Sequence, residues 1–329
     1  MNFDELTVKK EQIDQFRPLP PALVKNLEEW FTIELTYTSN ALEGNTLTRK
    51  ETAAVVEKGL TIGGKTLVEH LEATNHAKAL KEVMALAAAP TTDLTESHIL
   101  TIHNTILRGI DDTHAGCYRS IPVRISGSEV ILPNPMKVPD HMQAFISTLA
   151  QSSDLHPVEL AAKAHYELVT IHPFVDGNGR TARLLMNLIL LQHGYPPALI
   201  RKRDRLKYIS ALEQAQLGGS IDPYHRIIYE AANRSLDIYL NALTGKEEPT
   251  PTPNAERPLL KIGQLAKQCG ESNATIRFWT QKGLLQVADT TASGYQLYSP
   301  AMIERIKTIR ELQAKRYSLH EICTQISGE

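Results

Sequence analysis

Twelve residues near the middle of the chain contain the side chains best suited to chemistry, from His172 to Arg183 (HPFVDGNGRTAR). The stretch holds a histidine, a carboxylate at Asp176, a glycine-rich turn at 177–179 and two arginines, Arg180 and Arg183. His172 can accept a proton from a hydroxyl near neutral pH. A carboxylate beside phosphate oxygens is a typical Mg²⁺ ligand. Together these residue types indicate nucleotidyl or phosphoryl transfer from a Mg²⁺-nucleotide to a hydroxyl.

Two predicted helices position this stretch. Residues 157–171 have apolar side chains at helical spacing, and residues 181–193 are almost wholly apolar before a glycine stop. The turn at 177–179 therefore lies at the N-terminus of the second helix, where free backbone N–H groups and the helix dipole favour an anion. Arg180 and Arg183 share a helix face, and an anion bound between them explains two cations in a first turn.

A glycine turn beside one histidine is common and usually structural, but the combination of base, carboxylate, turn and arginine pair favours a catalytic site. The stretch resembles the signature of Fic-domain proteins, His-x-Phe-x-Asp/Glu-Gly-Asn-Gly-Arg-x-x-Arg, with every specified position filled. Members of that family typically transfer AMP from ATP to a Ser, Thr or Tyr hydroxyl of a protein. Relatives that phosphorylate instead depart from Gly-Asn-Gly-Arg, so the sequence favours AMP transfer.

The resemblance also implies roles for single residues. His172 is expected to be the general base, Phe174 to anchor the loop in the core, and Asp176 to bind Mg²⁺. The phosphates of ATP are expected to contact the turn and the two arginines: Gly177, Asn178, Gly179, Arg180 and Arg183.

A second motif ends the helix predicted from Ala22 to Glu43. Ser39 and Glu43 are four residues apart and share a face, and a glutamate in a last turn invites a cationic partner elsewhere. The segment 39–44 (SNALEG) resembles the inhibitory motif Ser/Thr-x-x-x-Glu-Gly/Asn of Fic proteins. The resemblance implies that Glu43 pairs with Arg183, blocks the γ-phosphate and keeps the wild type mostly inactive. In some relatives this glutamate is implicated in removing AMP, which leaves the reverse reaction open.

Composition bounds the remaining possibilities. The chain has 329 residues, 42% of them hydrophobic, which is enough for two or more domains. A net charge of −2 excludes a globally basic nucleic-acid coat. The three cysteines are far apart and have no metal-ligand spacing, which favours a reducing cytoplasm: Cys117, Cys269 and Cys323. The sequence shows neither an apolar signal core nor a run of 18 apolar residues, so we expect no membrane span.

Further patterns complete a mainly α-helical first part. Helices are predicted at 48–59, 67–89, from 95 onwards and at 222–243, whereas residues 1–21 are expected to be irregular. Residues 116–135 are predicted to form a β-hairpin around Ser126-Gly127-Ser128. Taken alone it would be an ordinary surface hairpin. In Fic proteins it is the flap, which covers the nucleotide and aligns the target as an added strand. The resemblance places Val123 near the adenine and Tyr208 beside the nucleotide.

The end of the chain differs in character. Residues 244–258 are rich in Pro, Thr and charge and are predicted to be a linker. Beyond it we expect a helix-turn-helix at 262–268 and 273–281, a hairpin at 286–298 with a wing at 293–295, a helix from Pro300 and a short one from Ser318. From residue 258 to the end there are nine Lys and Arg against six Asp and Glu, a net charge of +3 that suits a phosphate-facing surface.

This terminal module resembles the DNA-binding head of MerR-type regulators. The similar segments are 262–266 (IGQLA), 275–278 (TIRF), 282–285 (KGLL) and 294–298 (GYQLY). The resemblance implies that Arg277 and Tyr295 contact DNA. Gln296 replaces a usual wing arginine and the long dimerising helix is absent, so docking to a protein stays an alternative.

We therefore expect a mainly α protein, a Fic helical bundle with a short β-hairpin flap plus a small winged helix-turn-helix domain. The predicted domains are 1–94 with the inhibitory motif, 95–243 for the Fic domain, the linker, and 259–329 for the winged helix. The expected function is a cytoplasmic protein adenylyltransferase that uses ATP and Mg²⁺ on a protein docked along the flap, with self-modification, a homodimer and DNA as further partners. The alternatives are a DNA-binding regulator that senses nucleotide without turnover and a toxin of a paired system.

Overall fold

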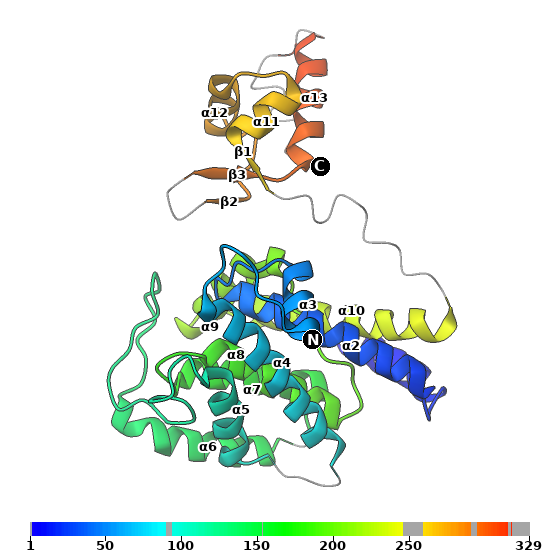
Figure 1. The fold of residues 1–329 in the computed structure, drawn as a ribbon, viewed down its shortest axis with the longest axis vertical. Helices are drawn as coiled ribbons and strands as arrows, with labels where there is room; N and C mark the ends of the chain where they lie inside the picture. The colour runs from blue at the N-terminus through cyan, green and yellow to red at the C-terminus, as the bar shows by residue number, and fades with distance from the viewer. Residues whose placement is uncertain are drawn as a thin grey trace. The chain divides into compact units, whose positions relative to one another are not determined.

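The computed structural model describes residues 2–89, 94–152, 154–245, 259–290, 295–314 and 317. The chain divides into two compact units, residues 1–246 and 247–329. In its described residues the first unit is helical and contains no β-strand, so the predicted mainly α class is confirmed (Figure 1). Its helices are α1 (Asp4–Asp14), α2 (Pro21–Leu42), α3 (Arg49–Lys58), α4 (Leu67–Ala88), α5 (Glu96–Leu107), α6 (Val138–Ala150), α7 (Pro157–Ile171), α8 (Asn178–Gln192), α9 (Arg205–Gln216) and α10 (Asp222–Thr244), with short 3-10 turns at Pro135–Lys137 and Lys202–Asp204.

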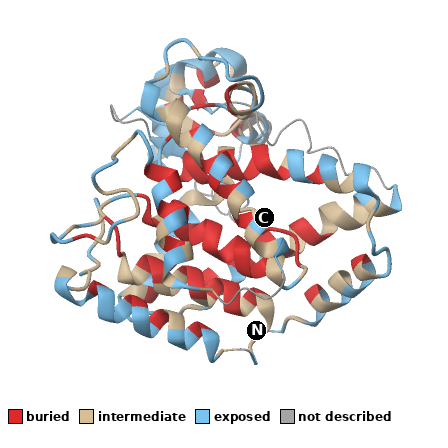
Figure 2. Cartoon of the chain, turned by 60° about the horizontal axis from the view of Figure 1, so that its bottom comes forward, coloured by how far each residue is buried: buried red, intermediate tan, exposed pale blue. Residues whose placement is uncertain are grey.

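Helix α8 lies at the centre of this unit because, apart from Asn187, its side chains from 184 to 190 are apolar on every face. Every residue from 184 to 190 is at most 4% exposed, and such a helix needs other helices on all sides. Helix α7 packs along it, and α4 and α5 cover other faces. Figure 2 shows buried residues concentrated on the packed central helices. The N-terminus of α8, which carries Arg180 and Arg183, is therefore held in place by the core.

Short polar signals set the starts of the surrounding helices. Thr48, Thr66 and Thr95 each accept a hydrogen bond from the backbone three residues on, in a reciprocal capping box. These caps explain why the helices predicted near 48, 67 and 95 begin where they do. None of the helices in the described residues combines the length and apolar character that crossing a membrane requires.

The start of the chain was predicted to be irregular, and this is wrong. Helix α1 buries Leu6 and Ile13 completely and packs against α10. Lys9 adds an ion pair to Asp237 of α10 at 2.7 Å. Two apolar residues seven apart are too few to show a helical period in a polar segment, so tertiary packing decides the structure here.

The flap, residues 116–135, also differs from the prediction of a β-hairpin. It makes a turn at Ser126 and Gly127, but no ladder joins its two arms. An isolated two-stranded hairpin is marginal in water, and here other groups hold the arms in place of cross-strand bonds. At the tip, Ser128 Oγ and the backbone N–H of Glu129 both donate to the Glu213 carboxylate of α9, at 2.6 and 3.1 Å.

The second unit contains the predicted helix-turn-helix and hairpin. Its elements are β1 (Leu260–Lys261), α11 (Ile262–Cys269), α12 (Asn273–Gln281), β2 (Asp289–Thr290), β3 (Gln296–Tyr298) and α13 (Ala301–Ala314). The sheet order is β1-β3-β2, all antiparallel, and β1 is a strand that the sequence did not predict. Trp279, Leu284 and Ile306 are among its buried core residues. Most of the predicted linker, the wing glycine and the helix predicted from Ser318 lie outside the described residues.

Candidate active site

The loop between α7 and α8 begins and ends in left-handed backbone. His172, which caps α7, has φ 51° and ψ 59°, and Gly177, which caps α8, has φ 78°. Among the described residues His172 is the one non-glycine with positive φ. That conformation costs about 1–3 kcal/mol and persists only where the surroundings hold it. Because α8 starts at Asn178, the glycine turn lies at the helix N-terminus, as predicted, where unpaired N–H groups attract an anion.

Asn178 closes this loop with its side chain. Its Nδ2 donates to the carbonyl oxygen of Phe174 at 3.0 Å, and its Oδ1 accepts from the backbone N–H of Phe174 at 2.9 Å. Phe174 is fully buried, as predicted. Both the oxygen and the nitrogen of the Asn178 side chain therefore bond within the loop, so we expect the contact of this residue with a phosphate to be made mainly by its backbone N–H.

His103 of α5 supports the other end of the loop and was not predicted. Its ring stacks on Phe174 with centroids 3.6 Å apart. The backbone N–H of Gly116 donates to Nδ1 at 3.0 Å, so Nε2 bears the hydrogen and donates to the carbonyl oxygen of Asp176 at 2.9 Å. Burial lowers the pKa of His103 to about 4. The ring is therefore neutral at physiological pH and keeps this arrangement.

Arg183 binds the end of helix α2. Its Nε donates to Ser39 Oγ at 2.9 Å, and its Nη2 donates to the Ser39 carbonyl at 3.0 Å and to Glu43 Oε1 at 2.6 Å. The structure thus brings together the two residues of the second motif and the second arginine of the first. The Glu43 carboxylate also lies against Gly179, where any Cβ would collide with it. A carboxylate therefore occupies the N-terminus of α8, the position that favours an anion.

A buried chain of hydrogen bonds supports Arg183 from behind. Arg183 hydrogen-bonds to Tyr208, whose hydroxyl contacts His165 Nε2 at 2.7 Å. The other ring nitrogen contacts the Tyr224 hydroxyl at 2.9 Å, and Tyr224 donates its hydrogen to the carbonyl of Ala162. His165 must then donate through Nδ1 and accept from Tyr208, so only one arrangement of hydrogens satisfies the chain. Burial lowers the pKa of His165 to about 3. Tyr208, expected beside the nucleotide, thus lies buried behind Arg183.

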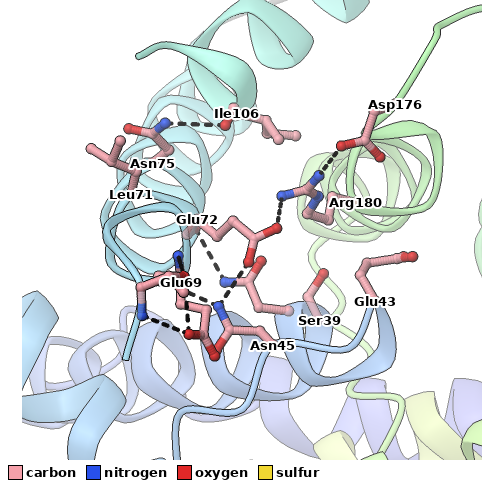
Figure 3. A network of polar contacts seen from close by, with 12 residues as sticks. Ser39, Glu43, Asn45, Glu69, Leu71, Glu72, Asn75, Ile106, Asp176 and Arg180 are labelled. Atoms are coloured by element: carbon pink, nitrogen blue, oxygen red, sulfur yellow. Dashed lines mark hydrogen bonds and ion pairs between the residues drawn. The ribbon is translucent and has the colours of Figure 1, made fainter. Parts of the chain in front are cut away.

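Arg180 lies between two carboxylates (Figure 3). Its Nη1 donates to Glu72 Oε1 of α4 at 2.9 Å and its Nη2 donates to Asp176 Oδ2 at 3.0 Å. Glu72 accepts a further bond from Asn45 Nδ2 at 2.8 Å. Glu72 was not predicted, and it links Arg180 to Asn45, the residue that follows the second motif.

The electrostatics of His172 suit a base. Nδ1 lies 3.3 Å from the carbonyl oxygen of Val169, so it bears the hydrogen and leaves Nε2 to accept a proton. Burial is the main influence and lowers the pKa of His172. The Arg119 cation lowers it too, whereas Glu43 and Asp176 raise it. The neutral form therefore predominates at physiological pH.

The donor set is compatible with magnesium delivered by a nucleotide. No cluster of three or more His, Cys, Asp or Glu side chains in the described ranges could hold a metal by itself. Mg²⁺ instead prefers one or two carboxylates together with phosphate oxygens and water. Asp176, whose side chain is 67% exposed beside the N-terminus of α8, is such a carboxylate.

The remaining predicted residues occupy two places. Val123 is half-buried on the flap. In the second unit, Arg277 is exposed on α12 and Tyr295 is exposed next to β3.

Comparisons with known proteins agree with these observations. A model of the Fic/DOC family matches residues 93–190, and a model of the MerR HTH family of regulatory proteins matches residues 260–327. The protein adenylyltransferase Fic of Nematostella vectensis is 42% identical over 210 residues, covering 63% of this chain and 48% of that protein. That of Culex quinquefasciatus is 37% identical over 277 residues, covering 83% and 55%. The chain spans about half the length of these curated relatives.

Solved structures extend the likeness. A Fic domain-containing signaling protein from Bacteroides thetaiotaomicron is 32% identical with a TM-score of 0.69, covering 75% of this chain and all of that one. Residues 134–508 of Fic-1 from C. elegans are 31% identical with a TM-score of 0.66, covering 74% and 73%. Fold and site define a helical protein in which a glycine turn at a helix N-terminus, a position that favours an anion, lies in the same loop as a neutral histidine. The chain belongs to the Fic family.

Proposed function

We propose that this protein transfers AMP from Mg²⁺-ATP to a Ser, Thr or Tyr hydroxyl of another protein. The observation that supports this most is the position of His172, a neutral, half-buried base at the entrance to a loop whose other end is a helix N-terminus that favours an anion. The name adenylyltransferase borne by the relatives points the same way.

In the proposed reaction, the target hydroxyl oxygen attacks the α-phosphorus of ATP while its proton passes to Nε2 of His172. The new P–O bond forms as the bond to pyrophosphate breaks, in line with the attack. The N–H groups at the start of α8, with Arg180 and Arg183, offset the negative charge of the phosphates. Mg²⁺ bound at Asp176 would supply further charge neutralisation. We place the target as an extended segment along the flap, with Val123 towards the adenine.

We further propose that the wild type is held inactive by Glu43. Its carboxylate engages Arg183 at 2.6 Å and lies on Gly179, so it competes with a phosphate for the same groups. The reverse reaction, removal of AMP, would use the same base and stays a second activity of this site. The three cysteines are far apart in the sequence, and on this ground we propose a reducing compartment such as the cytoplasm.

The position of the label distinguishes the proposed reaction from phosphorylation. We expect the protein with Glu43 replaced to pass label to the proteins of a cell lysate from ATP labelled on the α-phosphate, and none from ATP labelled on the γ-phosphate. Chelating magnesium with EDTA should abolish the transfer. Label arriving from the γ-phosphate would identify a kinase. Magnesium-dependent ATP binding without transfer of either label would favour a nucleotide sensor.

A second proposal concerns DNA. The MerR HTH family match covers the second unit, and Arg277 projects from the second helix of its helix-turn-helix into solvent. In this motif that helix enters the major groove. We propose that the second unit binds duplex DNA through α12 and the neighbourhood of Tyr295, which would bring the transferase to a DNA site.

In gel shifts with a pool of DNA duplexes of random sequence, the full chain should bind and slow a subset of the duplexes. Arg277→Ala is expected to weaken this binding by about tenfold, since an arginine contact to a base is worth about 1–3 kcal/mol. Arg203→Ala, which removes an exposed charge from the first unit, should leave it unchanged. Equal binding by all three proteins would remove Arg277 from the DNA contact, and no binding by the wild type would favour protein docking instead.

A further inference from the structure

Arg119, in the first arm of the flap, is a buried cation whose recorded partners are all backbone carbonyls. It is 2% exposed, and no ion pair to a carboxylate is recorded for it among the described residues. A buried charge is costly unless hydrogen bonds compensate it. The fork of donors on a guanidinium suits several acceptors at once. The position of Arg119 therefore suits a role in which one guanidinium donates to several backbone carbonyls.

The acceptors belong to three separate segments. Nε donates to the carbonyl oxygen of His172 at 2.8 Å, Nη2 to that of Pro133 at 2.7 Å, and Nη1 to that of Ile121 at 3.4 Å. In addition, the backbone N–H of Arg119 donates to the carbonyl of Pro173 at 2.9 Å. One side chain thus connects both arms of the flap with the residue that bears the base.

These contacts supply two supports that backbone hydrogen bonds do not provide: one between the arms of the flap and one at His172. The arms of the flap have no ladder between them, and the guanidinium joins Ile121 on one arm to Pro133 on the other. His172 has the strained left-handed conformation, and the same guanidinium fixes its carbonyl. The ATP-binding groups at 177–183 have no recorded contact with Arg119, so the two functions are separable.

We infer that Arg119 is a positioning residue: it fixes the flap relative to His172 and so sets where a hydroxyl on a flap-bound target meets the base. The inference rests on the proposed AMP transfer. A misplacement of about 1 Å in such a geometry can lower a rate about a hundredfold. ATP binding does not depend on this geometry.

The test compares Arg119→Lys and Arg119→Gln in a protein that also has Glu43→Gly. Label transfer from ATP labelled on the α-phosphate to lysate proteins should fall about a hundredfold in both. Calorimetry should find Mg²⁺-ATP affinity within about twofold of the parent. The two variants differ in charge. The Arg119 cation lowers the pKa of His172, and in this protein Glu43 is already removed while Asp176 is retained. Arg119→Gln should therefore move the acid limb of the pH–rate profile to higher pH, whereas Arg119→Lys, which keeps the charge, should not.

Arg108→Gln removes an exposed arginine charge at the end of α5 and should behave like the parent in every assay. Parental transfer by both Arg119 variants, a joint loss of ATP affinity and transfer, or an identical acid limb for Lys and Gln would each overturn the inference. If Arg119→Gln does not fold, the lysine variant decides through its ratio of transfer to ATP affinity. A parent that transfers no label refutes the proposed function itself, before any Arg119 variant is considered.

Discussion

Replacing Glu43 with glycine is expected to raise AMP transfer roughly thirtyfold over the wild type. The carboxylate engages Arg183 at 2.6 Å, and a charged hydrogen bond contributes about 2 kcal/mol. Such bonds contribute about 1.5–3 kcal/mol. We take a value in the lower part of this range because the Glu43 side chain is 37% exposed and solvent screens the ion pair. At 1.4 kcal/mol per factor of ten, about 2 kcal/mol is roughly thirtyfold. The measurement is label incorporated into lysate proteins from ATP labelled on the α-phosphate.

Two further variants show whether charge or bulk is responsible. Glu43→Gln keeps the size of the side chain and should activate less than glycine, because its amide still fills the space at Gly179. Glu29→Gln removes the same charge from the exposed face of the same helix and should stay at the wild-type level. The proposed inhibition is wrong if wild type and Glu43→Gly incorporate equal label.

Replacing His172 with alanine in the activated protein is expected to reduce transfer by about 10²- to 10⁴-fold, the usual contribution of a general base. Mg²⁺-ATP should bind as before, because the groups on α8 that are proposed to bind its phosphates are unchanged. His141→Ala, on the exposed face of α6, is the matched control and should retain full activity. Undiminished transfer by His172→Ala would remove the base from the mechanism.

The pH dependence of the activated protein follows from the same residue. Burial lowers the pKa of His172 from its ordinary 6.5, so the neutral, proton-accepting form persists below that pH. The rate should therefore fall to half its maximum at a pH below 6.5, on the acid side of an unperturbed histidine. Removing Glu43 also removes a charge that raises this pKa, which should move the decline further towards acid than in the residual activity of the wild type.

Site residues could be predicted from the sequence where they are contiguous or lie at helical spacing. The loop at 172–183 and the pair Ser39 and Glu43 could be located because each motif lies on one turn or one helix face. That Glu43 approaches Arg183 followed from the family resemblance, whereas their separation of 140 positions gives no local signal.

Single polar residues that act through distant partners were missed. His103 lies on the apolar face predicted for α5, next to Ile102, and a polar residue on such a face is a signal that could have been used. Arg119 lies in a segment without any period, so nothing in its surroundings marks it. Strand β1 has two residues, too short to show alternation. The flap was predicted as a hairpin because alternation indicates extended backbone but not which groups bond it.

The hydrogen-bond chain behind Arg183 bears on how the proposed inhibition by Glu43 can be relieved. Because Arg183 is buried and Tyr208 bonds it from behind, we expect the partner that is displaced to be the end of α2. That end is attached to α4, where Asn40 and Asn45 each donate to a backbone carbonyl at 3.1 Å. An activator that loosens the contact between the end of α2 and α4 is therefore expected to free Arg183.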